Sequence, residues 1–286
     1  MNGDTGALVV GLPDVTDVAP IAGTNDLWAI TSGDPGPQFL YRVHNGVATQ
    51  VADLYAFEAK HNPHPAEIDS NAFDVADLGG GGALVADAGG NDLLLVNKQG
   101  KVKLVAVLPD ELVSTANIKE LAGCPAGPPD FCSLPSMIPA EPVATSVAVG
   151  PDGAYYVGEL KGFPAPTGAS KVWRIAPNAR NARCGVSPLC TVALDGFTSI
   201  IDLAFGPDGR LNVAQIDDAS WAAVEIFEGE GALGGSVHAC NLQTKACSTL
   251  VSAEPILTSI TYRGSALWGA TWALVPGLAD VTQLLP

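Results

Sequence analysis

The chain has 286 residues, of which 47% are hydrophobic and 15% are charged, and it contains 32 Gly and 22 Pro. This composition supplies apolar surface for a large core and turn residues for many short strands, while no helical periodicity persists for long. The 14 basic and 30 acidic residues give a formal net charge of −16, which repels phosphate backbones and anionic lipids. We therefore expect no nucleic acid partner and no membrane insertion.

Taken in chain order, the predicted elements form five repeats of short apolar strands. The first strand of each repeat is followed by a turn and a second strand that ends on a polar residue. In the third and fourth repeats this turn is GPDG, at residues 150–153 and 206–209, a sequence that favours a tight turn. The repeats cover approximately residues 14–54, 69–109, 143–196, 197–252 and 255–286.

The fifth repeat differs from the others because it has three predicted strands instead of four. An apolar strand at residues 7–12 precedes the first repeat and would supply the missing outer strand. Since an unclosed ring would leave strand edges exposed, we expect this strand to close it. The sequence thus predicts a single all-β domain over residues 1–286, a β-propeller of five four-stranded blades closed by the N-terminal strand, with six blades as the alternative.

Polar residues recur at two positions in every repeat. Near the start of the first strands they are Asp17, Asp74, Ser146, Asp202 and Ser259. At the ends of the second strands, 12 to 14 residues later, they are Thr31, Asp87, Glu159, Gln215 and Thr271. Because an antiparallel second strand returns to the end where the first began, we expect two polar rings at one mouth of the central channel.

Five of these ring residues are carboxylates, which we expect to converge at the mouth. Like charges in close proximity need protons or a cation to compensate them, and oxygen-only ligands suit Ca²⁺ or Mg²⁺. The predicted metal ligands are Asp17, Asp74, Asp87, Glu159 and Asp202. Asp74 and Glu159 are the candidates for activating a water molecule beside such a cation. The alternative is that these side chains cap backbone groups and line a hydrated channel.

Aromatic residues lie in or beside the long loops that follow the second strands, at residues 160–170 and 216–235. An aromatic rim above a polar throat suits an apolar small molecule with one polar end. The predicted ligand-binding residues are Phe163, Gln215, Trp221 and Trp272. Packing between loops is the alternative interpretation of the aromatic residues.

The six cysteines fall in three close pairs: Cys124 with Cys132, Cys184 with Cys190, and Cys240 with Cys247. None has the CxxC spacing of a zinc site or a redox motif, so we favour three local disulfides and an oxidising compartment over six buried thiols. The opening MNGDTG has neither the basic nor the apolar region of a signal peptide. If the protein is secreted, we expect its signal to have been removed.

Several segments resemble the ScyD/ScyE family, which is named for scytonemin biosynthesis. They include DSNAFDVADL, LVADAGGNDLL and FTSIIDLAFGPDGRL, and the most specific is VGELKGFPAPTGASKVWRI. The resemblance covers residues from about 50 to 215 well. It implies a secreted or periplasmic NHL-like propeller, but it implies fold and compartment better than a reaction. Members of the family usually carry an additional N-terminal blade, and we expect no counterpart of it within residues 1–286.

The sequence leaves three functions open. We rank first an extracytoplasmic propeller that binds, or assists the processing of, a small aromatic or hydrophobic molecule at the channel mouth. The alternatives are a Ca²⁺- or Mg²⁺-assisted hydrolase or lactonase, similar to gluconolactonases and paraoxonases, and a protein-interaction scaffold without chemistry. No GxSxG nucleophile motif is present, and the GxGxxG match at residues 229–234 precedes a strand, so neither covalent catalysis nor dinucleotide binding is supported.

Overall fold

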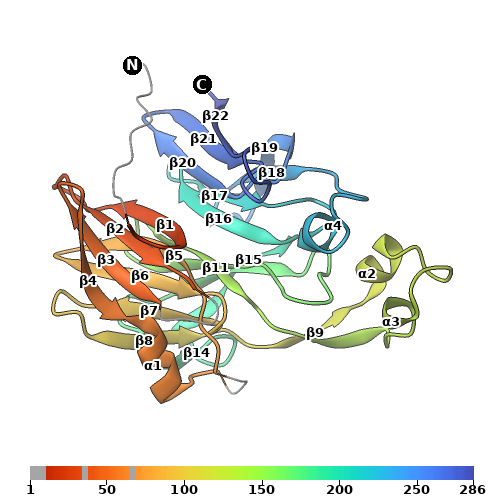
Figure 1. Cartoon of the computed structure of the whole chain (residues 1–286), viewed down its shortest axis with the longest axis horizontal. Coiled ribbons are helices and arrows are strands. Elements are labelled where there is room, and N and C mark those ends of the chain that lie inside the picture. The colour runs from red at the N-terminus through yellow and green to blue at the C-terminus, as the bar shows by residue number, and fades with distance from the viewer. Residues whose placement is uncertain (1–10, 34–37, 65–67) are drawn as a thin grey trace.

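The structure is a computed structural model that describes residues 11–33, 38–64 and 68–286. It is all-β, and its five small sheets are arranged as the blades of a five-bladed β-propeller, as the repeats predicted (Figure 1). The N-terminal strand predicted at residues 7–12 lies mainly outside the described residues. No helix in the described part of the chain is long and apolar enough to cross a membrane.

The strands of the blades follow one another in chain order. Blade 1 contains β1 (Val15–Pro20), β2 (Leu27–Thr31), β3 (Phe39–His44) and β4 (Val47–Asp53). Blade 2 contains β5 (Ala72–Gly79), β6 (Gly82–Asp87), β7 (Asp92–Val96) and β8 (Val102–Val107). Blade 3 contains β11 (Ala144–Val149), β12 (Tyr155–Glu159), β13 (Ser170–Ile175) and β15 (Cys190–Phe197). Blade 4 contains β16 (Ile200–Phe205), β17 (Leu211–Gln215), β18 (Gly235–Cys240) and β19 (Cys247–Glu254), and blade 5 contains β20 (Ser259–Arg263), β21 (Ala266–Thr271) and β22 (Asp280–Leu285).

The blades pack face to face, so that their inner strands are covered on both sides. The first strands β5, β11 and β16 each lie beside the first strands of the preceding and following blades. Every residue of β12 and β17 is consequently buried. Four apolar clusters fill the spaces between consecutive blades; Trp28 lies in the cluster between blades 1 and 2, and Trp173 lies in the one between blades 2 and 3.

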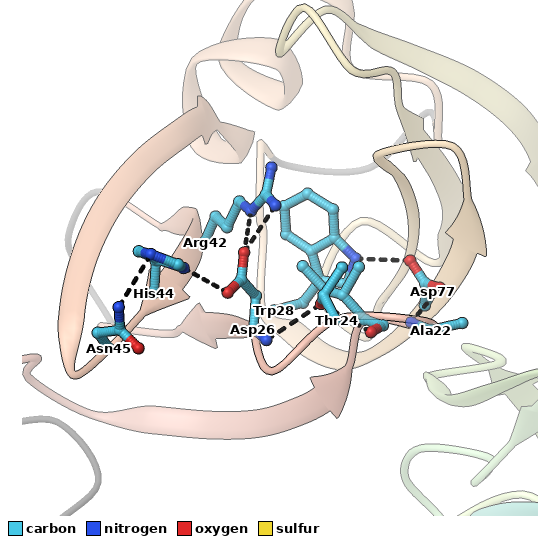
Figure 2. Close-up of polar contacts among 9 residues, drawn as sticks. Ala22, Thr24, Asp26, Trp28, Arg42, His44, Asn45 and Asp77 are labelled. Atoms are coloured by element: carbon cyan, nitrogen blue, oxygen red, sulfur yellow. Dashed lines mark hydrogen bonds and ion pairs between the residues drawn. The ribbon is translucent and has the colours of Figure 1, made fainter.

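Polar contacts also connect neighbouring blades. Figure 2 shows Trp28 of β2 pointing at Asp77 of β5, and its Nε1 donates a hydrogen bond to that carboxylate at 3.0 Å. Other polar contacts in the same view lie within blade 1: Asp26 lies between Arg42 and His44, 2.8 Å from the arginine Nε and 2.6 Å from the histidine Nδ1. These hydrogen bonds, the one with His44 first, lower the pKa of Asp26.

Two blades depart from the four-stranded prediction. A two-residue strand, β14 (Ala182–Arg183), leaves blade 3 and pairs in parallel with β8, which gives blade 2 a fifth strand. Blade 5 has three strands among the described residues. Its predicted closure by residues 7–12 therefore remains a prediction.

A long excursion between blades 2 and 3 projects from the ring at the right of Figure 1. This arm consists of residues 109–142 and contains β9 (Glu111–Ser114), α2 (Ala116–Leu121), α3 (Pro129–Cys132) and β10 (Met137–Ala140). The predicted disulfide between Cys124 and Cys132 lies within it, and the other two predicted disulfides, Cys184–Cys190 and Cys240–Cys247, lie in blades 3 and 4. Two further helices are α1 (Leu54–His61), after blade 1, and α4 (Trp221–Glu225), in the loop after β17.

Candidate functional site

Three of the predicted carboxylates meet at the centre of the ring. Asp17, Asp74 and Asp202 line a cavity of about 50 Å³, which Ser259 also lines. Each of the three accepts a hydrogen bond from the first strand of the next blade. The donors are Val75 N for Asp17 (3.0 Å), Val147 N for Asp74 (2.5 Å) and Ile260 N for Asp202 (2.6 Å). These side chains therefore fasten blade 1 to 2, blade 2 to 3, and blade 4 to 5.

Burial in this cavity disfavours the charged form of the three carboxyl groups. Desolvation raises the pKa of all three, and the neighbouring charges of Asp17 and Asp202 raise the pKa of Asp74 further, to well above its ordinary value. The pKa of Asp202 is raised to about 7. A cavity of about 50 Å³ has room for a water molecule or a single ion, but not for an organic ligand.

The second predicted ring does not line this cavity. Its members sit at the ends of the second strands and bind the segments around them. Asp87 accepts hydrogen bonds from Asn71 N, Gly90 N and Ser70 Oγ. Gln215 accepts from Thr198 N and donates to Asp218 and Ser236. The second-ring side chains thus hold the segments that lead into and out of the blades.

Glu159 belongs to a separate buried network that the sequence did not predict. Its Oε2 accepts from Trp173 Nε1 at 2.9 Å, and its Oε1 lies 3.1 Å from Lys161 Nζ. Lys161 is fully buried and also pairs with Glu111 of the arm at 2.8 Å. Desolvation raises the pKa of Glu159 to about 7, although Lys161 opposes this shift. The catalytic candidates Asp74 and Glu159 therefore lie in different networks.

The structure brings together three of the five predicted metal ligands, Asp17, Asp74 and Asp202, and places Asp87 and Glu159 elsewhere. Within the described ranges, no group of three or more His, Cys, Asp and Glu side chains has an arrangement that could hold a metal ion.

A second cluster of buried carboxyl groups also escaped prediction. Glu58 of α1 and Asp92 at the start of β7 lie close to Asp87. Desolvation and the charge of Asp87 raise the pKa of Glu58 to about 8, and the pKa of Asp92 is raised well above its usual range. Neither residue follows the repeat, so the repeat could not identify them.

Two of the predicted ligand-binding aromatics pack under the arm. Trp221 donates its Nε1–H to the carbonyl of Lys161 at 2.9 Å. Phe163 contacts Phe131 of the arm, with ring centroids 6.5 Å apart, and remains 41% exposed. Asn117 of α2 completes the contact by donating to the carbonyls of Ala165 and Ala219. Gln215, the predicted polar partner of these aromatics, is buried.

The fourth predicted ligand-binding residue, Trp272, lines a cleft with a volume of about 880 Å³. The cleft is formed by α4 and the loop after it, the segment between β19 and β20, and the segment between β21 and β22. Its lining is apolar or glycine except for three carboxylates. The lining residues are Asp217, Val224, Glu225, Glu228, Gly229, Ala232, Leu233, Gly234, Ala253, Pro255, Ile256, Trp272, Leu274 and Val275.

Comparisons with known proteins support the fold. No model of a known family and no curated protein sequence matches the chain. Among solved structures, virginiamycin B lyase from Staphylococcus aureus aligns with a TM-score of 0.53 and 10% identity over 94% of this chain and 69% of the lyase. A chain of a nidogen/laminin complex aligns with a TM-score of 0.53 and 10% identity over 94% of this chain and 76% of that one. A protein of unknown function from Bacteroides thetaiotaomicron aligns with a TM-score of 0.53 and 11% identity over 93% of this chain and 58% of that one. At these identities the likeness shows a β-propeller and no more.

Proposed function

We propose that the protein is a ligand-binding propeller whose small hydrophobic ligand occupies the cleft lined by Trp272. The observation that carries this proposal is the cleft itself, because about 880 Å³ of mostly apolar space matches the size and character of small-molecule sites. The indole of Trp272 is 41% exposed, and Leu233 and Leu274 of the same lining are 65% and 49% exposed. Exposed apolar side chains gathered around a concavity are typical of a binding surface. The cleft shares no lining residue with the small cavity at Asp17, Asp74 and Asp202.

The resemblance to the ScyD/ScyE family and the three disulfides support an extracytoplasmic location for this binding. Disulfides form and persist in secreted and periplasmic proteins. We therefore place the ligand, in this proposal, outside the cytoplasm.

A fluorescence titration with the neutral aromatic probe N-phenyl-1-naphthylamine tests the proposal. We expect saturable binding at one site and a loss of about tenfold or more in affinity for Trp272→Ala, because a large aromatic contact is removed. Phe163→Ala is the matched control, since Phe163 is an equally exposed aromatic that contacts the arm and not the cleft. Unchanged affinity in Trp272→Ala, or an equal loss in Phe163→Ala, would contradict this assignment.

A further inference from the structure

The charged groups of the cleft all have one sign. Glu225 and Glu228 line it, whereas no Lys, Arg or His of the described ranges does. Asp217 lines it as well, but its two carboxylate oxygens already accept three backbone N–H groups, from Ala219, Leu233 and Gly234. Asp217 therefore shapes the loop, and Glu225 and Glu228 remain to face an occupant.

Glu225 carries a charge that the described part of the protein does not compensate. No hydrogen bond or ion pair of its carboxylate is found among the described residues, and desolvation is the one cause that raises its pKa. Glu225 is nevertheless an exposed residue, so its carboxylate keeps water as a partner, and a cation that enters the cleft gains a modest ionic contact with it.

Trp272 adds a second feature that favours a cation. Its indole is 41% exposed at the cleft, and the face of an indole is the best aromatic partner for an organic cation.

We propose that the cleft selects cationic amphiphiles, that is, molecules with an apolar or aromatic body and one amine or quaternary ammonium group. The body packs against Leu233 and Ile256, and the cationic group faces Glu225 and the indole of Trp272. This inference rests on the proposed function, because it names the ligand class of the same cleft.

The test compares three probes with the same decyl chain: decyltrimethylammonium, decyl maltoside and decanesulfonate. Each is titrated calorimetrically below its micelle concentration near neutral pH. We expect the ammonium probe to bind about tenfold or more tightly than the sulfonate, through the combined contacts with the carboxylate and the indole. Glu225→Gln is expected to weaken ammonium binding about three- to tenfold and to leave maltoside binding unchanged.

Glu230→Gln is the matched control, because it lies in the same loop, is exposed, and changes the net charge equally without lining the cleft. It separates a local contact from the general attraction of an acidic protein for cations. Equal affinities for the ammonium and sulfonate probes, or equal losses in Glu225→Gln and Glu230→Gln, would overturn the cation preference and leave the cleft as a binding site. If none of the three probes binds, both the cation preference and the proposed function are contradicted.

Discussion

The stability of the ring should decrease as the pH rises from 5 to 8, and Asp202 should cause a measurable part of that loss. In the folded protein the pKa of Asp202 is about 7, against an ordinary value of 3.8. Between these values the folded state holds a proton that the unfolded chain has released. Because the folded state binds more protons, its free energy of unfolding falls as pH increases through this window.

The size of the effect follows from the raised pKa. One pKa unit corresponds to about 1.4 kcal/mol, and about two units separate pH 5 from the folded-state pKa, so the contribution of Asp202 lost between pH 5 and pH 8 is on the order of 2–3 kcal/mol. Asp202→Asn removes the titrating group and should reduce the pH-dependent loss by that amount. Its carbonyl oxygen can still accept the hydrogen bond from Ile260 N.

The assay is urea unfolding of the protein and of Asp202→Asn at pH 5 and pH 8, in EDTA so that no divalent cation contributes. Asp208→Asn is the matched control. It changes the net charge equally in the same blade, but an ion pair with Arg210 lowers the pKa of Asp208, which therefore does not titrate in this window. If Asp202→Asn loses as much stability between the two pH values as the unmodified protein, to within about 0.5 kcal/mol, Asp202 is not protonated in the folded state and the reasoning is refuted.

Three further predictions concern the contacts that support the site. Lys161→Met should destabilise the fold by about 3–5 kcal/mol in urea unfolding, because it leaves the buried Glu159 without its cation. Adding Glu159→Gln to this variant should restore most of the lost stability, and no recovery would mean that the pair is not coupled. Replacing Cys124 and Cys132 with Ser should cost the arm about 2–3 kcal/mol and accelerate tryptic cleavage after Lys119, whereas unchanged cleavage would show that the disulfide does not hold the arm. Trp28→Phe should cost about 1–2 kcal/mol through the lost hydrogen bond to Asp77, and a neutral result by thermal unfolding would contradict that contact.

The five blades could be predicted from the sequence because every blade meets the same physical demands. Each needs a short first strand, a tight turn and a doubly buried second strand, and the GPDG turns place Gly153 and Gly209 at φ +75° and +76°. The short strand β14 and the helices of the arm escaped prediction. These elements depend on contacts with other parts of the chain, and their own sequences show no periodic pattern that would predict them.

The strands were predicted correctly, but the polar residues at the ends of the second strands do not line the central cavity as the first-strand residues do. In blade 2 the register shifts between Ala72 and Asp74, so that Asp74 lies opposite Ala86 and Asp87 lies opposite Ala72. Because successive side chains of a strand point to opposite faces, this bulge separates the directions of the two carboxylates. The same shift recurs in blades 1, 3 and 4. Spacing along the sequence does not reveal a bulge.

The cleft itself was not predicted, and one of the four predicted ligand-binding residues, Trp272, lines it. Trp272 was identified by its place beside a loop, whereas Glu225, Leu233 and Ile256 come from segments with no common pattern in the sequence. Three loops from two blades form this site, and only the folded chain places them together. Lys161 could have been noticed, since it is the one charged residue in the loop at residues 160–169 and directly follows a buried strand that ends in Glu159.

The measurement that tests the central claim most directly is photo-crosslinking with benzophenone, a neutral aromatic molecule, followed by peptide mapping. The account predicts saturable labelling of the segments at residues 224–234, 253–256 and 272–275, and competition by N-phenyl-1-naphthylamine. Labelling confined to the arm at residues 109–142 or to the loop at residues 160–170, or labelling that does not saturate, would contradict the claim that this cleft is the ligand site.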